Sequence, residues 1–128
     1  MSKQKFYTCP ICGNMIAKVK DSGINVVCCG KPMQEIVPGT IEASKEKHIP
    51  EYTIENNVVR VVVGSIEHPM IEEHYIEWIS IQTKFGNQRK VLEPNQKPEV
   101  QFALCEGDEL EVVYAYCNLH GLWINENK

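Results

Sequence analysis

Six cysteines and four histidines are the residues of this 128-residue chain best suited to metal chemistry. Four of the cysteines form a Cys-x-x-Cys pair followed by glycine and then an adjacent pair: Cys9, Cys12, Cys28 and Cys29. A Cys-x-x-Cys-Gly turn can bring two thiolates to one ion, because glycine relaxes the backbone while amide N–H groups point at the sulfurs. Two further cysteines complete a tetrahedral site.

The adjacent pair Cys28 and Cys29 is unusual for a metal site. Neighbouring residues of a strand point to opposite faces, so binding both thiolates to one ion requires a local distortion of the backbone. Iron and zinc both fit four cysteines, since a structural zinc ribbon uses similar spacings, and a Cys28–Cys29 disulfide is a further alternative. Metal is favoured over disulfides if the chain is cytoplasmic, because that compartment keeps thiols reduced.

A second set of candidate ligands occupies the rest of the chain, in loops or at strand ends: His48, His68, His74, Cys117 and His120. Cys117 and His120 have a chelating spacing, because a two-residue loop can bring a thiolate and an imidazole to one ion. Neutral imidazoles with one thiolate suit iron, copper or zinc. Five ligands are one more than zinc usually takes and one fewer than octahedral iron, so the set would leave a position vacant for substrate.

The first group of cysteines must be positioned by a small, turn-rich segment. Residues 7–36 contain many glycine, proline and aspartate turn residues, which predict hairpins around a metal centre. Pro38 and Gly39 then interrupt the pattern. We place a domain boundary there, which gives domains 1–37 and 38–128. A first domain of this size needs a metal ion to supplement its core.

The second group must be positioned by strands rather than helices, because no amphipathic helix of useful length is visible. Runs of β-branched and aromatic residues predict strands at 57–63, 75–82, 100–103 and 110–116. In one of these strands, alternation places Ile76, Trp78 and Ser80 on one face and Tyr75, Glu77, Ile79 and Ile81 on the other. The sequence therefore predicts an all-β chain whose second domain is a β-sandwich or barrel.

Composition and charge exclude several classes of function. A hydrophobic content of 43% with 23% charged residues is that of an ordinary globular chain. The net charge of −4 and pI near 5.6 argue against nucleic acid as a partner. No stretch approaches the roughly 20 apolar residues that span a bilayer, and no signal peptide is visible after Met1. We therefore expect a cytoplasmic protein without a membrane partner.

Together these motifs resemble the desulfoferrodoxin family of superoxide reductases over essentially the whole chain. The four early cysteines resemble its desulforedoxin-like iron-tetrathiolate module. Four further segments resemble its catalytic motifs in order: Glu-Lys-His-Ile-Pro at 46–50, His-Pro-Met at 68–70, His-Tyr-Ile at 74–76 and Cys-Asn-Leu-His-Gly at 117–121. No ligand position departs from the family pattern.

The resemblance implies two iron ions per chain, one held by the four early cysteines and one by the later set. It implies a square-pyramidal ferrous site with His48, His68, His74 and His120 in the equatorial plane and Cys117 as axial ligand. It also implies an immunoglobulin-like β-sandwich and a homodimer. The implied activity is reduction of superoxide to hydrogen peroxide, with re-reduction by an external donor such as rubredoxin or a similar small redox protein.

Two residues beside His48 are expected to take part in catalysis. Lys47 could attract the superoxide anion to an acidic protein, because one ammonium beside a metal focuses an approaching anion. Glu46 resembles the carboxylate that can occupy the sixth position of the oxidised iron in this family. Without the adjoining ligand, both would be ordinary surface residues. Cys105 matches no ligand position and is expected to be a buried strand-end residue.

Two other functions remain open at this stage. One is a non-enzymatic electron-transfer or metal-storage protein, in which the five-ligand site is another redox centre with its sixth position filled. The other is a zinc-stabilised binding module that presents Trp78 and Trp123 to a partner. Those tryptophans are more simply explained as core residues of a sandwich.

Overall fold

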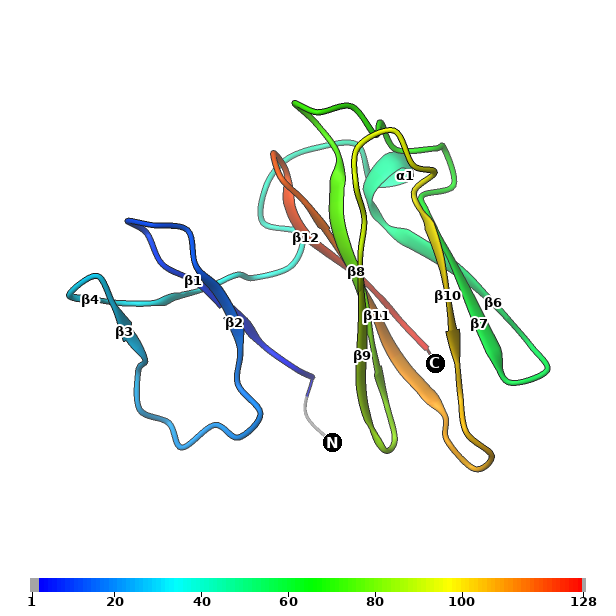
Figure 1. The fold of residues 1–128 in the computed structure, drawn as a ribbon, viewed down its shortest axis with the longest axis horizontal. Helices are drawn as coiled ribbons and strands as arrows, with labels where there is room; N and C mark the ends of the chain where they lie inside the picture. The colour runs from blue at the N-terminus through cyan, green and yellow to red at the C-terminus, as the bar shows by residue number, and fades with distance from the viewer. Residues whose placement is uncertain (1–2, 128) are drawn as a thin grey trace. The chain divides into compact units, whose positions relative to one another are not determined.

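A computed structural model describes residues 3–127; Met1, Ser2 and Lys128, at the outer ends of the two expected domains, lie outside the described residues. The chain divides into two compact units, Met1–Val37 and Pro38–Lys128. Strands dominate both, which confirms the predicted all-β class (Figure 1).

The first unit consists of five very short strands. One sheet has the order β2 (Met15–Ala17), β1 (Phe6–Thr8), β5 (Gln34–Glu35), with antiparallel pairing throughout. The strands β3 (Val27–Cys28) and β4 (Lys31–Pro32) form a separate hairpin. The expected hairpins are therefore present.

The core of the first unit is small. Phe6, Cys9 and Met33 are its buried side chains with apolar character, whereas Val19 and Ile24 are exposed. A unit with so little buried apolar surface would gain much of its stability from a metal ion at its four cysteines, as small metal-dependent domains do.

The second unit contains two antiparallel sheets. The first has the order β10 (Glu99–Ala103), β7 (Val58–Val63), β6 (Pro50–Glu55). The second has the order β12 (Gly121–Glu126), β11 (Leu110–Cys117), β8 (Ile76–Thr83), β9 (Gly86–Val91). All four predicted strands are present, and β6, β9 and β12 are additional.

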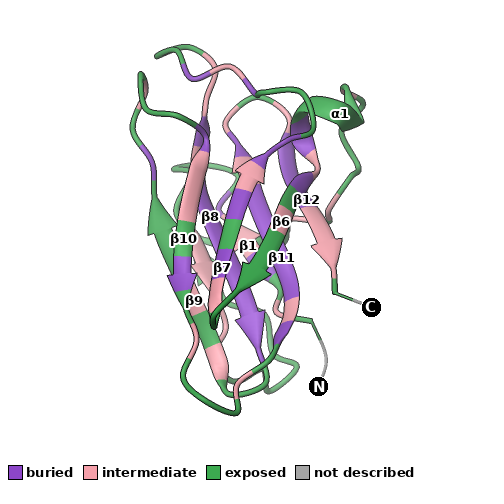
Figure 2. Ribbon diagram, turned by 90° about the vertical axis from the view of Figure 1, so that its right-hand side faces the viewer, coloured by how far each residue is buried: buried purple, intermediate pink, exposed green. Residues whose placement is uncertain are grey.

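The inner faces of the two sheets enclose one apolar core. Its buried members are Val59, Val61, Val63, Met70, Ile76, Ile79, Ile81, Leu92, Phe102, Leu110, Val113, Ala115 and Cys117. The central strands β8 and β11 are buried along most of their length, whereas β6 and β9 are mainly exposed (Figure 2). This arrangement confirms a β-sandwich-like second unit, because side chains from two facing sheets form its core.

The alternation predicted for β8 is wrong at Ile76. Ile76 belongs to the core with Ile79 and Ile81, because the register shifts between Ile76 and Trp78 and leaves Glu77 without a partner residue on β11. A β-bulge of this kind inserts one residue and reverses the facing of what precedes it. Trp78 therefore lies on the opposite face, where it is 8% exposed.

The sequence did not predict the single helical turn α1 (Lys45–His48). It begins after Ser44 and ends at His48; the next residue, Ile49, has an extended backbone because Pro50 follows it. Among the described residues, no helix is long and apolar enough to cross a membrane. The importance of α1 is local, since its last residue, His48, is buried.

Candidate metal centres

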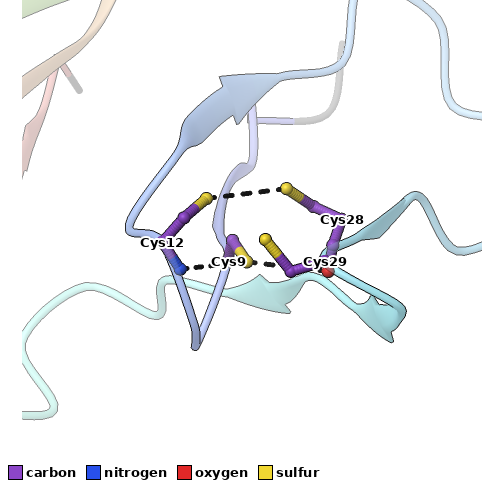
Figure 3. Close-up of side chains that lie close together, drawn as sticks. All are labelled: Cys9, Cys12, Cys28 and Cys29. Carbon is purple, nitrogen blue, oxygen red and sulfur yellow. Dashed lines mark hydrogen bonds between the residues drawn. The ribbon is translucent and has the colours of Figure 1, made fainter.

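The four early cysteines come together in the first unit. Cys9 and Cys12 lie in the turn after β1, Cys28 ends β3, and Cys29 follows in the β3–β4 hairpin. Their four sulfur atoms all lie within 4.8 Å of one another, and Figure 3 shows them pointing into a common space. The structure thus gathers all four predicted ligands of the first centre.

The sulfur spacing fits one tetrahedral ion. The Sγ atoms of Cys12 and Cys28 are 3.7 Å apart. Four thiolates at about 2.3 Å from a central ion would lie about 3.8 Å from one another. All six cysteines are free thiols, so the structure does not contain the alternative Cys28–Cys29 disulfide.

The backbone at the adjacent pair is distorted as predicted. Cys29 has a φ of +53° and Gly30 a φ of +73°, in the left-handed region that non-glycine residues seldom adopt. This reversal turns the Cys29 side chain to the same side as that of Cys28. Two neighbouring thiols can therefore face one ion.

Backbone amides polarise the site in favour of thiolates. The N–H of Cys12 and that of Ile11 donate to Cys9 Sγ and lower the pKa of that thiol to about 6. Crowding acts in the other direction, because hydrogen bonds with Cys12 and the other thiols raise the pKa of Cys29 to about 12. A cation would relieve this crowding by replacing the protons.

The second group lies at one end of the sandwich, and the topology explains why. His48 and His68 flank the paired ends of β6 and β7, while His74, Cys117 and His120 lie at the paired ends of β8, β11 and β12. In antiparallel pairs the start of one strand lies beside the end of its neighbour. The two sheets also contact each other through β6 and β12, so residues separated by up to 72 positions meet at one end of the sandwich.

The four imidazole rings form a closed square. Successive ring centroids are 4.6 Å apart for His48–His68, 4.6 Å for His68–His74, 5.0 Å for His74–His120 and 4.9 Å for His120–His48. Neighbouring rings are nearly perpendicular, at 79° to 84°. The opposite pair His48–His74 is 6.2 Å apart and tilted by only 28°. Such a square is the arrangement of four equatorial ligands.

The nitrogen spacing provides a test of metal fit. His48 Nε2 lies 3.0 Å from His120 Nδ1 and 3.2 Å from His68 Nε2. Two donors at right angles, each about 2.1 Å from an ion, would be about 3.0 Å apart. The donor atoms of four residues all lie within 4.8 Å of one another: His48, His74, Cys117 and His120. His68 is not in this group, but its contact with His48 places it in the square.

Backbone contacts fix the inward-facing nitrogens. His48 Nδ1 lies 2.6 Å from the Ser44 carbonyl oxygen, and His68 Nδ1 lies 2.7 Å from that of Pro69. A proton on each Nδ1 would leave Nε2 as the lone-pair donor, the usual role of such contacts at metal sites. Within residues 3–127, His74 Nε2 is buried and has no hydrogen-bond partner, as expected of an atom whose partner is a metal ion.

Burial favours the neutral form of three of the imidazoles. Desolvation lowers the pKa values of His48 and His74, and it lowers that of His68 to about 4. Neutral imidazole is the form that binds metal, so the apolar surroundings favour coordination over protonation.

The thiol of Cys117 completes the group. It is fully buried, its Sγ is 3.9 Å from His120 Nδ1, and it accepts a hydrogen bond from the His120 backbone N–H at 3.4 Å. Desolvation raises the pKa of Cys117. A metal ion would therefore be needed to hold this sulfur as a thiolate in its apolar surroundings.

The histidine square is supported by two residues whose supporting role was not predicted from the sequence. The Asn118 side chain accepts a hydrogen bond from the Tyr75 N–H and donates one to the Glu73 carbonyl, so it binds both neighbours of His74. Trp123 is buried as predicted, but it also packs on His48 at 5.1 Å and donates to the His120 carbonyl. The position of Asn118 inside the Cys117–His120 loop was the only available signal.

The remaining candidates lie on the surface. Lys47 is exposed on α1, and its charge contributes to the lowered pKa values of His48 and His74. Glu46 is also exposed, and its carboxylate accepts a hydrogen bond from Ser44 Oγ at 2.8 Å. Cys105 is exposed, contrary to expectation, because it lies in the loop after β10 rather than in the strand.

The fold and the two clusters define a class: an all-β metalloprotein with a four-cysteine centre in a small first unit and a histidine–cysteine centre at one end of a β-sandwich. Residues 40–126 match the family described as Desulfoferrodoxin, and residues 2–36 match its N-terminal domain. The chain belongs to the desulfoferrodoxin family. Its clusters are consistent with the two iron centres of that family.

Relatives and solved structures support this placement. A desulfoferrodoxin from Syntrophotalea carbinolica is 42% identical over 97% of both chains. The superoxide reductase from Treponema pallidum has a TM-score of 0.83 and 36% identity, covering 98% of this chain and 100% of the other. The one-iron superoxide reductase from Giardia intestinalis has a TM-score of 0.57 and 35% identity, covering 66% of this chain and 99% of its own.

Proposed function

We propose that this chain is a superoxide reductase, which converts superoxide, one electron and two protons into hydrogen peroxide. The observation that carries this proposal is the square of four imidazoles with the Cys117 thiol beside it. Five donors leave one position of an octahedral iron for a small anion. The names of the similar solved structures point to the same activity.

In this proposal the two clusters bind different irons. Cys9, Cys12, Cys28 and Cys29 hold one in a desulforedoxin-like domain, residues 1–37. Five residues would hold the catalytic iron in the superoxide reductase domain, residues 38–128: His48, His68, His74, Cys117 and His120. In its ferrous form this metal would supply the electron that superoxide takes up.

Lys47 attracts the substrate. The protein has a net charge of −4, which repels an anion at long range. Lys47 immediately precedes His48 on α1, and its charge adds to the larger effect of desolvation in lowering the pKa values of His48 and His74. A local cation can focus an approaching anion even where the overall charge is unfavourable.

Glu46 and Cys117 have different roles in this proposal. The Glu46 carboxylate is tethered to Ser44 in this structure and lies on the exposed α1 turn, from which it can approach the open position after product leaves. The Cys117 sulfur accepts a hydrogen bond from the His120 backbone N–H, which would moderate how much electron density a thiolate at this position gives to a bound metal.

The cycle needs a one-electron donor from outside the chain. We infer rubredoxin or a similar small redox protein, a homodimeric assembly and a cytoplasmic setting, each from membership of the family.

The decisive experiment combines metal analysis, visible spectroscopy and superoxide kinetics on the full chain. We expect two irons per chain, thiolate-to-iron charge-transfer bands in the oxidised protein, and peroxide production from superoxide without oxygen evolution. Zinc with no visible bands would instead establish a zinc-stabilised binding module. Two irons that do not react with superoxide would establish an electron-transfer or storage protein.

A further inference from the structure

The sulfur of Cys28 receives a hydrogen bond from a side chain. Asn14 Nδ2 lies 3.6 Å from Cys28 Sγ, and the backbone N–H of the same asparagine donates to Cys12 Sγ at 3.5 Å. The backbone carbonyl oxygen of Asn14 accepts a hydrogen bond from the Cys9 N–H at 2.8 Å. Asn14 is therefore held against three of the four cysteines, although its own side chain is exposed.

The contact from the Asn14 side chain differs in kind from the other N–H···S contacts in this unit. Ile11, Cys12 and Asn14 each donate through the backbone, so almost any residue except proline would preserve those bonds. The bond to Cys28 requires a side chain that carries a donor at this position. It is thus a feature of the sequence and not only of the turn.

A hydrogen bond to a thiolate ligand affects the two redox states unequally. Reduction adds negative charge to a four-thiolate iron centre, and an N–H donor stabilises the more negative state more strongly. Hydrogen bonds to ligating sulfurs are accordingly among the factors that set the potentials of iron–sulfur sites.

We propose that the Asn14 carboxamide raises the reduction potential of the four-cysteine iron centre by donating a hydrogen bond to Cys28. Asn14 is then a positioning residue that acts through a ligand. This inference rests on the proposed function, since it takes the bound metal to be iron. A substitution of this one exposed residue would then change the reduction potential of the first centre.

The test is a redox titration of the charge-transfer band of the first centre in the iron-loaded full chain. We expect Asn14→Ala to lower the ferrous-to-ferric ratio at a fixed potential by up to about tenfold, equivalent to about 59 mV for a one-electron couple. Asn14→Asp should lower it further, because a carboxylate adds negative charge beside the sulfur. Asn14→Gln, which retains the amide, should recover part of the loss.

The matched control is Asn25→Ala, an exposed asparagine of the same unit that donates to no cysteine in the part of the chain the structure describes. It should leave the potential unchanged. If Asn14→Ala binds iron normally and keeps the wild-type potential, or if Asn14→Asp raises it, the proposal is wrong. A purely structural role would alter iron content or stability without this ordered series of potentials.

A second measurement does not depend on iron. In the chain loaded with ¹¹³Cd, the Asn14 side-chain amide protons should show scalar coupling to cadmium through Cys28 Sγ, and absence of this coupling would overturn the proposal. A wild-type first centre that takes up no iron would contradict the proposed function instead. The cadmium spectrum would still decide whether Asn14 donates to Cys28.

Discussion

The Glu46 carbonyl oxygen lies 2.5 Å from the position that a Cβ atom on Gly64 would occupy. The carbonyl of Ile49 and the backbone carbon of Lys47 lie at 3.0 Å from the same point. Gly64, at the end of β7, is thus in close contact with the whole turn that carries Glu46, Lys47 and His48. Only a residue without a side chain allows α1 to approach this closely.

We expect Gly64→Ala to displace α1 and to weaken the second centre. The added methyl group meets backbone atoms, which cannot rotate away, so the cost should be about 1–3 kcal/mol of unfolding free energy. Iron at the histidine site and the rate with superoxide should both fall. The four-cysteine centre is the internal control, and loss of both irons in equal measure would contradict a local effect.

Replacing Asn118 by alanine should loosen His74. The variant would lose both side-chain hydrogen bonds that Asn118 makes to Glu73 and Tyr75, the two neighbours of His74. Loss of a contact that positions a ligand typically lowers metal affinity by about 10–100-fold. Competition with a chelator followed by iron analysis measures the effect.

Asn127→Ala is the matched control for Asn118→Ala. The Asn127 side chain also makes two hydrogen bonds, with the Tyr52 hydroxyl and the Leu110 carbonyl, but at the far end of β11. It should reduce stability while leaving iron affinity intact. Equal loss of iron in the two variants would show that Asn118 acts only through global stability.

The Lys47→Ala variant should associate with superoxide about tenfold more slowly. The dependence of the rate on ionic strength should also flatten, because salt then screens no steering charge. Pulse radiolysis or stopped-flow mixing measures both. Lys45→Ala removes an equally exposed lysine from the same turn and should behave as wild type; if it slows association as much as Lys47→Ala, the effect is one of net charge.

Replacing one cysteine ligand of either centre with serine should show which iron each set of ligands binds. Cys117→Ser should abolish activity and the colour of the second centre, whereas Cys12→Ser should remove only the iron of the first. Iron content and the visible spectrum of each variant give the answer. Retention of two irons by both variants would argue against the proposed ligand sets.

Glu77→Gln should stabilise the protein at neutral pH. Desolvation raises the pKa of Glu77, so the folded chain binds its proton more tightly than the unfolded chain does. The charged carboxylate therefore becomes a cost as the pH rises through this raised pKa, and glutamine avoids it. Thermal unfolding at pH 7 and pH 4 should show a gain that disappears at the acidic value; a constant gain would indicate another cause.

The four-cysteine centre could be predicted closely from sequence because its ligands lie near one another along the chain. A Cys-x-x-Cys turn and an adjacent pair restrict the geometry strongly, and even the distortion at Cys29 follows from strand stereochemistry. The histidine site was harder, because His48 and His120 are ambiguous individually. Their convergence depends on strand pairing that only the family resemblance or a structure supplies.

Other features escaped prediction for physical reasons. The edge strand β9 is polar along most of its length, so Gly86–Val91 has the composition of a turn rather than a strand. The bulge at Glu77 shifts the facing of Ile76 without any sequence signal. The α1 turn is too short for a periodic pattern, and the role of Gly64 depends on contacts with distant backbone atoms.

The placement of the two ligand sets along the chain has a consequence for assembly during synthesis. All four thiols of the first centre precede residue 30, whereas the last ligand of the second cluster is His120. At a translation rate of about 5–20 residues per second, roughly 5–18 s separate the appearance of Cys29 from that of His120. A nascent chain can therefore acquire its first metal before His120, the last ligand of the second site, has been synthesised.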